Sequence, residues 1–487
     1  MKIAFVYPDI QPRFRFWRGY YYCGIGSLSA YLKQYGHDTL LIHMIRNPSK
    51  EKFINCLREE KPDLIGFSCT SHAFPVVEKL AGWIKEENKR LLVICGGIHP
   101  TVSPDETIDT EGIDMICRGE GEEPLLELCN KLDKGENIHN ILNIWSKFEG
   151  EVHRNPLRPP YQDLDRLPFP DRKIFHYRDL FIESQGYATV MVSRGCPYEC
   201  SYCCNHVLKE LYGKGTKYTR FRSVDNAISE IKHIVKEFPF IRGIHFDDDI
   251  LILNKRWGEA FMARYRDEVG LPFSCNGRPN LLDKETVELM SKAGCQEVSI
   301  GLESGNDYIR NEVLKRKLSR KQIIDAFGLC KKFGIHIKSF NMVGIPHEDT
   351  RAVLDTIKLN AEVDVNAIQA TIFQPYKGTT LFDLCAKRQF LAAGGLSMDF
   401  FSEAPLILDS IKLQQILMFR NYFKIFVAFY KLLGKLPGCI SPLFINSADR
   451  ILSSFYTAVV LNKIYVPMNF FFRLFQLRKI RLRKKSF

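Results

Sequence analysis

Two long series of alternating strand-like and helix-like segments constrain the fold of this chain more than any other feature of its sequence. In the first series, apolar runs such as "KIAFVYP" (2–8), "DLIGFSC" (63–69) and "LLVICGG" (91–97) alternate with amphipathic stretches. Short apolar runs between turns are typical of strands buried in a parallel sheet, and apolar residues three to four positions apart are typical of helices. The first series therefore predicts a doubly wound, Rossmann-like α/β domain over residues 1–145.

The second series begins after a connector rich in proline, "RNPLRPPYQDLDRLPFPDR", which opposes regular structure and places a linker at residues 146–185. Six strand-like runs follow, from "YATVMVSRGC" to "AIQATIFQPYKGT", with helical periods between them. Six strand–helix repeats predict a complete or partial TIM-like (β/α)6 barrel over residues 186–388. The chemistry of such a barrel lies on the loops that follow its strands.

The alternation ends beyond the barrel, and residues 389–487 are expected to form a helical region. Its aromatic-rich segments lack the ~18 uninterrupted apolar residues of a spanning helix. The final "RLFQLRKIRLRKKSF" has seven basic residues and no acidic one, in a chain of net charge +12. Such a tail favours peripheral contact with a membrane surface and not binding to nucleic acid, although a plain solvated tail remains the alternative.

The start of the chain, "MKIAFVYPDI", lacks the charged and long apolar regions of a secretory signal. We therefore expect the protein in the cytoplasm, with a peripheral location at the inner face of the membrane if the basic tail binds lipid. The chain has fifteen cysteines, an odd number in a long chain, which favours reduced thiols and metal ligation where they cluster.

Three cysteines cluster in "CPYECSYC", directly after the first strand of the second series: Cys196, Cys200 and Cys203. A structural zinc site uses four ligands, commonly two CxxC pairs, and this chain has no second CxxC. Three thiolates can instead hold three irons of a 4Fe-4S cluster and leave the fourth iron open. Cys204 adjoins the motif, but consecutive loop side chains point apart, so we assign Cys203. A zinc site completed by Cys204 is the alternative.

Ligands of a doubly wound sheet bind at the carboxyl ends of its strands. Glycines there let a large planar ligand or a phosphate approach the backbone, although they could also serve only as turns. No GxGxxG follows the first strand, which argues against a dinucleotide. The candidate ligand-binding residues of this domain are Ser68, Thr70, Ser71, Gly96, Gly97, Gly119, Glu120 and Gly121.

The CxxxCxxC motif, with Tyr202 before its last cysteine, resembles the signature of the radical S-adenosylmethionine superfamily. The segments "HFDDDIL", "CNGRPN", "GLESGND", "VGIPHEDT" and "FQPYKGTTLF" are similar to later barrel loops of that family. The resemblance implies a six-unit partial barrel whose open iron binds S-adenosylmethionine, with Tyr202 against the adenine. It implies polar contacts to cofactor or substrate from Asp247, Asp248, Asp249, Arg278 and Glu303. A solvated acidic turn, or an Arg278 that pairs with these carboxylates, are the structural alternatives.

The first domain resembles that of cobalamin-binding members of the superfamily, in "GIGSLSAYLKQYGHD", "VICGGIHPTVSPDE" and "DMICRGEGEEPLLEL". The family's DxHxxG motif is absent from the sequence, so cobalamin should lack a histidine ligand from that motif, and His37 is expected to be structural. The resemblance implies a cobalamin-dependent methyltransferase that modifies an unactivated carbon of a small-molecule or lipid-type substrate. An electron donor such as flavodoxin or ferredoxin would supply its electrons. No catalytic side chain is identified. The alternatives are radical rearrangement, ring contraction or oxidative cyclisation, and a non-enzymatic iron–sulfur redox sensor.

Overall fold

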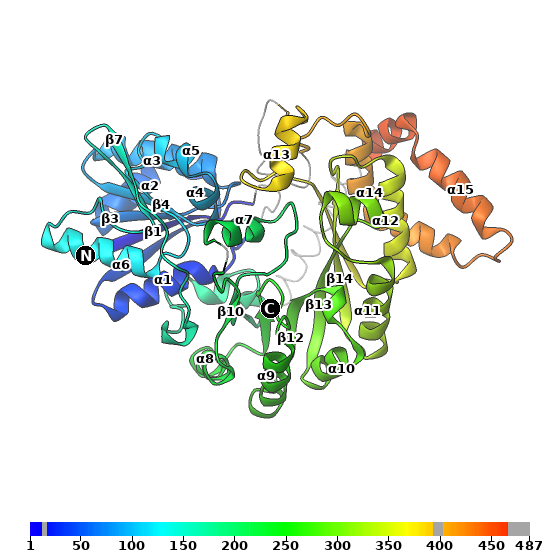
Figure 1. The fold of residues 1–487 in the computed structure, drawn as a ribbon, viewed down its shortest axis with the longest axis horizontal. Coiled ribbons are helices and arrows are strands. Elements are labelled where there is room, and N and C mark those ends of the chain that lie inside the picture. The colour runs from blue at the N-terminus through cyan, green and yellow to red at the C-terminus, as the bar shows by residue number, and fades with distance from the viewer. Residues whose placement is uncertain (12–16, 214, 393–402, 466–487) are drawn as a thin grey trace, which may run out of the picture. The chain divides into compact units, whose positions relative to one another are not determined.

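The computed structural model describes residues 1–11, 17–213, 215–392 and 403–465 of the chain (Figure 1). These residues divide into two compact units. The first unit consists of residues 1–299, 332–335 and 375–383, and the second of the remaining segments between 300 and the C-terminus. The division does not follow the predicted domain boundaries, because the first unit contains the first domain, the linker and the first strands of the barrel.

The first sheet has seven strands in the order β2-β1-β3-β4-β5-β6-β7. Five parallel strands form its centre: β1 (Lys2–Pro8), β2 (Asp38–Met44), β3 (Leu64–Ser68), β4 (Leu92–Gly96) and β5 (Met115–Cys117). The edge is an antiparallel hairpin of β6 (Ile144–Phe148) and β7 (Glu151–Arg154). The sequence predicts a boundary near residue 145, but the hairpin extends the sheet to Arg154 because β6 pairs directly with β5.

Helices cover both faces of this sheet (Figure 1), as the doubly wound prediction requires. On one face, α1 (Cys23–Gln34) packs beside α6 (Glu122–Lys134). The other face carries α2 (Lys50–Glu60), α3 (Phe74–Glu87), α4 (Ile98–Val102) and α5 (Pro104–Asp109). The strands between them are apolar and almost fully buried, as Ile3, Val6 and Leu64 illustrate. Burial of these side chains from water is the main source of stability for such a layered core.

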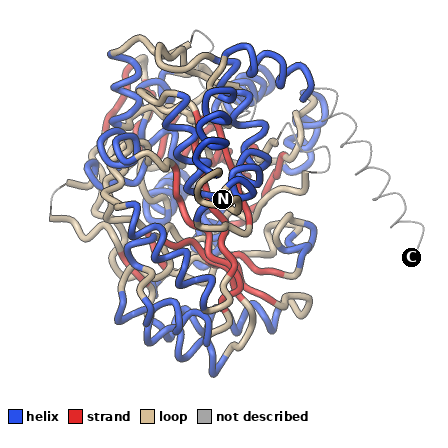
Figure 2. The backbone as a smooth tube through the Cα atoms, turned by 90° about the vertical axis from the view of Figure 1, so that its right-hand side faces the viewer, coloured by secondary structure: helices blue, strands red, loops and turns tan. Residues whose placement is uncertain are grey.

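After the β6–β7 hairpin, the rest of the linker has no long helix, as its prolines predict, and its helical turns are the short 3-10 turns Leu164–Arg166, Tyr177–Asp179 and Glu183–Gln185. A six-stranded sheet follows, in the order β8-β11-β12-β13-β14-β15. Its strands are β8 (Tyr187–Val190), β11 (Gly243–Phe246), β12 (Phe273–Gly277), β13 (Cys295–Glu303), β14 (His336–Val343) and β15 (Ala367–Ile372). The predicted partial barrel of six strand–helix units is confirmed, and Figure 2 distinguishes the helices from the strands along the backbone.

The helices between these strands are α7 (Cys204–Leu211), α8 (Val224–Glu237), α9 (Lys255–Glu268), α10 (Lys284–Lys292), α11 (Arg320–Lys332) and α12 (Thr350–Glu362). Several begin at a residue whose side chain caps the first turn, as Ser223 does for α8 and Asp349 for α12. A short antiparallel pair, β9 (Ser193–Arg194) with β10 (Arg220–Phe221), lies between β8 and α8 in the chain. Two further turns are Pro279–Leu281 and the π-helical Ile309–Val313.

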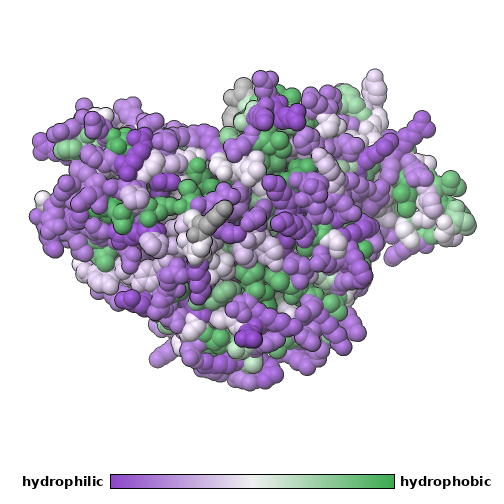
Figure 3. Space-filling view, viewed as in Figure 1, coloured by the Kyte–Doolittle hydropathy of each residue, from purple (hydrophilic) through white to green (hydrophobic). Residues whose placement is uncertain are grey.

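The C-terminal region is helical, with α13 (Thr380–Lys387), α14 (Leu413–Leu433) and α15 (Ser441–Leu452). Within the second unit, α14 packs against α12, and its buried side chains include Phe419, Phe423 and Phe426. Apolar side chains also gather on the surface at α15 (Figure 3). Among the residues that the structure describes, no helix is both long and apolar enough to span a bilayer.

Candidate active site

The three predicted cluster cysteines lie on one loop, between β9 and α7, and all three are half-buried. The loop is closed by a backbone hydrogen bond from the Cys203 amide to the Cys200 carbonyl, at 3.1 Å. Burial raises the pKa of Cys196 to about 12, and the nearby Asp249 carboxylate and the thiols of Cys203 and Cys200 act in the same direction. The thiols are therefore close enough to resist joint ionisation, and a cationic group is needed to hold all three as thiolates.

Cys203 ionises more readily than Cys196. Its sulfur accepts hydrogen bonds from the Cys204 thiol, from the Asn205 backbone amide and from the Asn205 side chain, and the Cys204 bond does most to lower its pKa to about 7. The Cys204 thiol is the donor in this pair, so its own pKa is raised well above normal. Cys203 is thus prepared as a thiolate ligand, whereas Cys204 supports its neighbour.

The donor set suits an iron–sulfur cluster better than a single zinc ion. In the described ranges, no three His, Cys, Asp or Glu side chains gather closely enough to hold one metal ion. Thiolates on a cluster bind separate irons and need not converge on one point. Three cysteines on a loop at the carboxyl end of a barrel strand fit this requirement.

A cavity of about 390 Å³ lies within the first unit, at the carboxyl ends of the strands of the first sheet. Six of the eight residues predicted for this edge line it: Ser68, Gly96, Gly97, Gly119, Glu120 and Gly121. The other two do not. Thr70 is exposed, and Ser71 is buried with its hydroxyl 3.2 Å from Nδ1 of His99. Both follow the last residue of β3, where the chain has already turned away from the edge.

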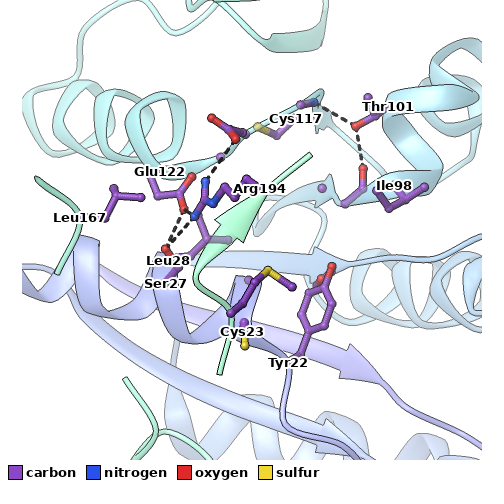
Figure 4. Close-up of a pocket in the computed structure, with 18 of the residues that line it drawn as sticks. Tyr22, Cys23, Ser27, Leu28, Ile98, Thr101, Cys117, Glu122, Leu167 and Arg194 are labelled. Carbon is purple, nitrogen blue, oxygen red and sulfur yellow. Dashed lines mark hydrogen bonds and ion pairs between the residues drawn. The ribbon is translucent and has the colours of Figure 1, made fainter. Parts of the chain in front are cut away.

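Two glycines of the cavity wall are required by close backbone approaches. Gly97 has φ +106°, and a Cβ there would lie 2.7 Å from the Cys69 carbonyl oxygen. Gly119 has φ +74°, and its Cβ would lie 2.3 Å from the Tyr212 hydroxyl. Thr101 connects the two turns, since its hydroxyl donates to the Gly97 carbonyl at 2.7 Å and accepts from the Gly119 amide at 3.0 Å (Figure 4). These turns keep side chains out of the cavity and leave backbone at its surface.

Two glutamates of the cavity wall are engaged by arginines from the β9–β10 pair. Glu120 pairs with Arg220 at 2.8 Å and with Arg194 at 3.4 Å. The buried Glu122 accepts from Ser27 at 2.7 Å and from Arg194 at 2.5 Å (Figure 4). Although burial opposes ionisation of Glu122, Arg194 and Ser27 hold its pKa below the ordinary value. Glu120, predicted as a ligand contact, is therefore already part of an ion-pair network that fixes the cavity wall.

Sequence reasoning missed the contribution of the first turns of α1 and of the residue before it. Tyr22, Cys23 and Ser27 line the cavity, and burial raises the pKa of Cys23 to about 12. Arg194, two residues before Cys196, also lines it. The signal was present in the topology rule: the loop after β1 must reach the same carboxyl edge as the loops after β3, β4 and β5.

The three aspartates that follow β11, Asp247 to Asp249, differ in their surroundings. Asp248 is buried, and its carboxylate accepts from the amides of Val192 at 3.0 Å and Ser193 at 2.6 Å, which fixes the chain ahead of Cys196. Asp247 and Asp249 line the cavity instead. The Asp247 side chain is 53% exposed, yet partial desolvation at the cavity wall, and then the charge of Asp249, raise its pKa to about 6. The cavity is thus bounded by glycine turns on one side and by carboxylates on another.

The remaining predicted residues lie at other barrel loops. Tyr202 is half-buried between two of the cysteines. The buried Arg278 guanidinium lies over the Tyr198 ring, 3.7 Å from its centroid. Glu303 belongs to the second unit, where it ends β13 with φ +62° and lies 3.5 Å from Arg316. A non-glycine residue in this left-handed conformation is strained, which is common at functional sites.

Comparisons with known proteins agree with this arrangement. The chain matches the B12 binding domain model over residues 20–129 and the Radical SAM superfamily model over residues 190–359. It is 30% identical to an uncharacterized methyltransferase, PH0819, of Pyrococcus horikoshii, over 76% of this chain and 79% of that protein. It is 26% identical to the anaerobic magnesium-protoporphyrin IX monomethyl ester cyclase of Rubrivivax gelatinosus, over 74% of this chain and 65% of that protein.

The fold is similar to that of OxsB, a cobalamin-dependent S-adenosylmethionine radical enzyme solved with aqua-cobalamin bound. The TM-score is 0.69 at 16% identity, over 95% of this chain and 75% of that chain. The chain belongs to the radical S-adenosylmethionine superfamily, in the methyltransferase family that carries a B12-binding domain. The expectations of an enzyme with a 4Fe-4S cluster, S-adenosylmethionine and cobalamin as its cofactors are confirmed.

Proposed function

We propose that this enzyme transfers a methyl group to an unactivated carbon of a small-molecule or lipid-type substrate. The observation that carries the proposal is the cavity at the edge of the B12-binding domain, which Asp247 and Asp249 of the barrel also line. One unit therefore brings the edge of the first sheet and the barrel loops to a single cavity. A substrate carbon held there would be accessible to both cofactors, as methyl transfer by radical chemistry requires.

In this proposal Cys196, Cys200 and Cys203 hold the 4Fe-4S cluster. Tyr202, Asp247, Asp248, Asp249, Arg278 and Glu303 surround S-adenosylmethionine, with Asp248 acting through the backbone of Val192 and Ser193. Ser68, Gly96, Gly97, Gly119, Glu120 and Gly121 form the cobalamin surface, while Thr70 and Ser71 support it from outside the cavity. When bound, the cofactors supply a carbon-centred radical and a transferable methyl group. The chain itself binds, orients and excludes water.

We infer that the cobalt of bound cobalamin would lack a histidine from a DxHxxG motif, because the sequence contains no such motif. No histidine is among the described residues that line the cavity. His37 is buried in the turn after α1, with Nε2 3.1 Å from the Asn130 side chain and Nδ1 3.3 Å from the amino terminus. This histidine therefore has a structural role, as the absence of DxHxxG from the sequence predicts.

An external electron donor, such as flavodoxin or ferredoxin, completes the proposal, because the cluster must be reduced before each radical is formed. We also place the protein in the cytoplasm, with a peripheral contact at the inner face of the membrane through the C-terminal region. A second candidate reaction is an oxidative cyclisation, and the similarity to the Rubrivivax gelatinosus cyclase favours it over other rearrangements.

Product analysis distinguishes these reactions. The anaerobically reconstituted protein is incubated with S-adenosylmethionine, cobalamin and a reductant, and the products are separated by mass spectrometry. We expect 5′-deoxyadenosine together with S-adenosylhomocysteine, and neither above background in Cys200→Ala. Deoxyadenosine without S-adenosylhomocysteine would favour cyclisation or rearrangement. Failure of the intact cluster protein to cleave S-adenosylmethionine would leave only a redox-sensing role.

A further inference from the structure

The C-terminal helices expose many large apolar side chains to solvent. A helix pair that contacts only water would not need this exposure. The exposed side chains at the end of α14, in the following turn and on α15 include Leu432 at 63%, Leu443 at 67%, Phe444 at 53% and Ile451 at 59%. Tyr456, after α15, is 82% exposed. Single exposed apolar residues are ordinary, but a group of this size on two neighbouring helices and the turn between them marks an interaction surface. We call Leu432, Leu436, Ile440, Leu443, Phe444 and Ile451 the apolar face.

Helix α15 turns its acidic residue toward the protein and several large apolar side chains toward solvent. Its single acidic residue, Asp449, faces the protein, where it accepts hydrogen bonds from the Tyr430 hydroxyl and from Lys358 at 2.9 Å. Phe444 and Ile451, seven residues apart and so on one side of the helix, face outward. Because the acidic group is bound inward, the outward surface of α15 carries only neutral and basic side chains.

The positive charge of the chain is concentrated in the same C-terminal region as the apolar face. Residues 411–487 contain fourteen Lys and Arg and one acidic residue, so residues 1–410 contain the remaining 54 basic and 55 acidic residues. The whole positive charge of the protein therefore belongs to the C-terminal region. Among its described members, Lys424, Lys435, Arg450 and Lys463 are exposed. The apolar face is thus part of a segment whose charged side chains are almost all basic.

The combination selects one kind of partner. A second copy of the chain would oppose basic segments to each other, and like charges disfavour that contact. A nucleic acid would attract the basic side chains, but its phosphate backbone offers no apolar region in which Leu443 or Phe444 could be buried. An anionic bilayer satisfies both features, because apolar side chains enter the acyl boundary while Lys and Arg remain among acidic headgroups.

We propose that the apolar face docks on the surface of a membrane that contains anionic lipid, with α15 lying in the interface. The proposal does not depend on the reaction of the enzyme. It gives the peripheral contact a defined surface, and it would place the protein where lipid-type substrates are concentrated.

Vesicle flotation of the full-length protein tests the surface. The vesicles are phosphatidylcholine alone or phosphatidylcholine mixed with phosphatidylglycerol. The double variant Leu443→Glu/Phe444→Glu alters only exposed positions, and Phe148→Glu, at a side chain 46% exposed on β6, is the matched control. We expect binding of the unaltered protein and the control to mixed vesicles, and roughly a tenfold lower partition coefficient for the double variant. Circular dichroism confirms that each variant is folded.

Three results would overturn the proposal. The first is equal binding of the double variant and the unaltered protein, which would mean that charge alone carries the contact. The second is equal binding to both kinds of vesicle, or to neither. The third is sedimentation that shows a dimer in the unaltered protein and a monomer in the double variant, since the apolar face would then be a contact between copies.

Discussion

The side-chain amide of Asn205 donates a hydrogen bond to the sulfur of Cys203, at 3.8 Å, and another to Oδ1 of Asp249, at 3.0 Å. The Tyr218 hydroxyl in turn donates to Oδ1 of Asn205 at 3.0 Å, which fixes the orientation of the amide. Asn205 therefore links the cluster ligand Cys203 to Asp249, a carboxylate of the cavity wall. Hydrogen bonds to a ligating sulfur stabilise the more negative, reduced state of a cluster and so raise its reduction potential.

Replacement of Asn205 by alanine should lower the reduction potential of the cluster by about 40 mV, since a hydrogen bond contributes ~1 kcal/mol and 59 mV corresponds to a tenfold change for one electron. Tyr218→Phe, which removes only the group that orients the amide, should give a smaller shift in the same direction. A redox titration followed by electron paramagnetic resonance, without S-adenosylmethionine, measures both. An unchanged potential in Asn205→Ala would assign the residue a role in folding alone.

Adjacent glycines provide a matched test of the cavity wall. Gly97→Ala should cost about 2–4 kcal/mol of folding free energy, because φ is +106° and the new Cβ would lie 2.7 Å from the Cys69 carbonyl oxygen. Gly96→Ala should cost less than about 1 kcal/mol, because the nearest atom to its Cβ is 3.8 Å away. Denaturant unfolding of the two apo variants measures the difference. Equal losses would contradict the close approach at Gly97.

Most of the fold could be predicted from the sequence, because the periodicity of apolar residues specifies strand and helix in both series. The hairpin β6–β7 could not, since antiparallel pairing at a sheet edge leaves the same local pattern as a connector. The cavity was partly predictable: Gly96 ends β4, and Gly97 and Gly119 follow strands, as the topology rule requires. The engagement of Glu120 by Arg220 was not, because a contact across 100 positions leaves no local signal.

Neighbouring glutamates on the first turn of α6 should differ strongly in their contribution to stability. Glu122→Ala should cost about 3 kcal/mol, because it leaves Arg194 and Ser27 without the carboxylate they bind in a buried position. Glu123→Ala should cost less than about 1 kcal/mol, because that side chain is 45% exposed and lies 3.7 Å from Arg158. Chemical unfolding of the apo protein compares them. Similar costs would show that the Arg194 pair is not a net contributor.

The pKa of Asp247, raised to about 6 by burial and then by Asp249, predicts how one substitution changes the pH dependence of stability. Because the folded protein binds the proton more tightly than the unfolded chain, ionisation of Asp247 weakens the fold as pH rises from about 4 to about 6. Asp247→Asn removes this ionisation, so the variant should gain stability relative to the unaltered protein across that interval and differ little in pH dependence outside it. Asp267→Asn is the control that should show little change across this interval, because Arg266 holds the pKa of Asp267 below its ordinary value and the effect of that carboxylate on the pH dependence lies below about pH 4. Thermal unfolding of the apo proteins over this pH range measures the differences, and a relative loss of stability in Asp247→Asn as pH rises would mean that the Asp247 carboxylate is stabilised by a positive charge within the cavity.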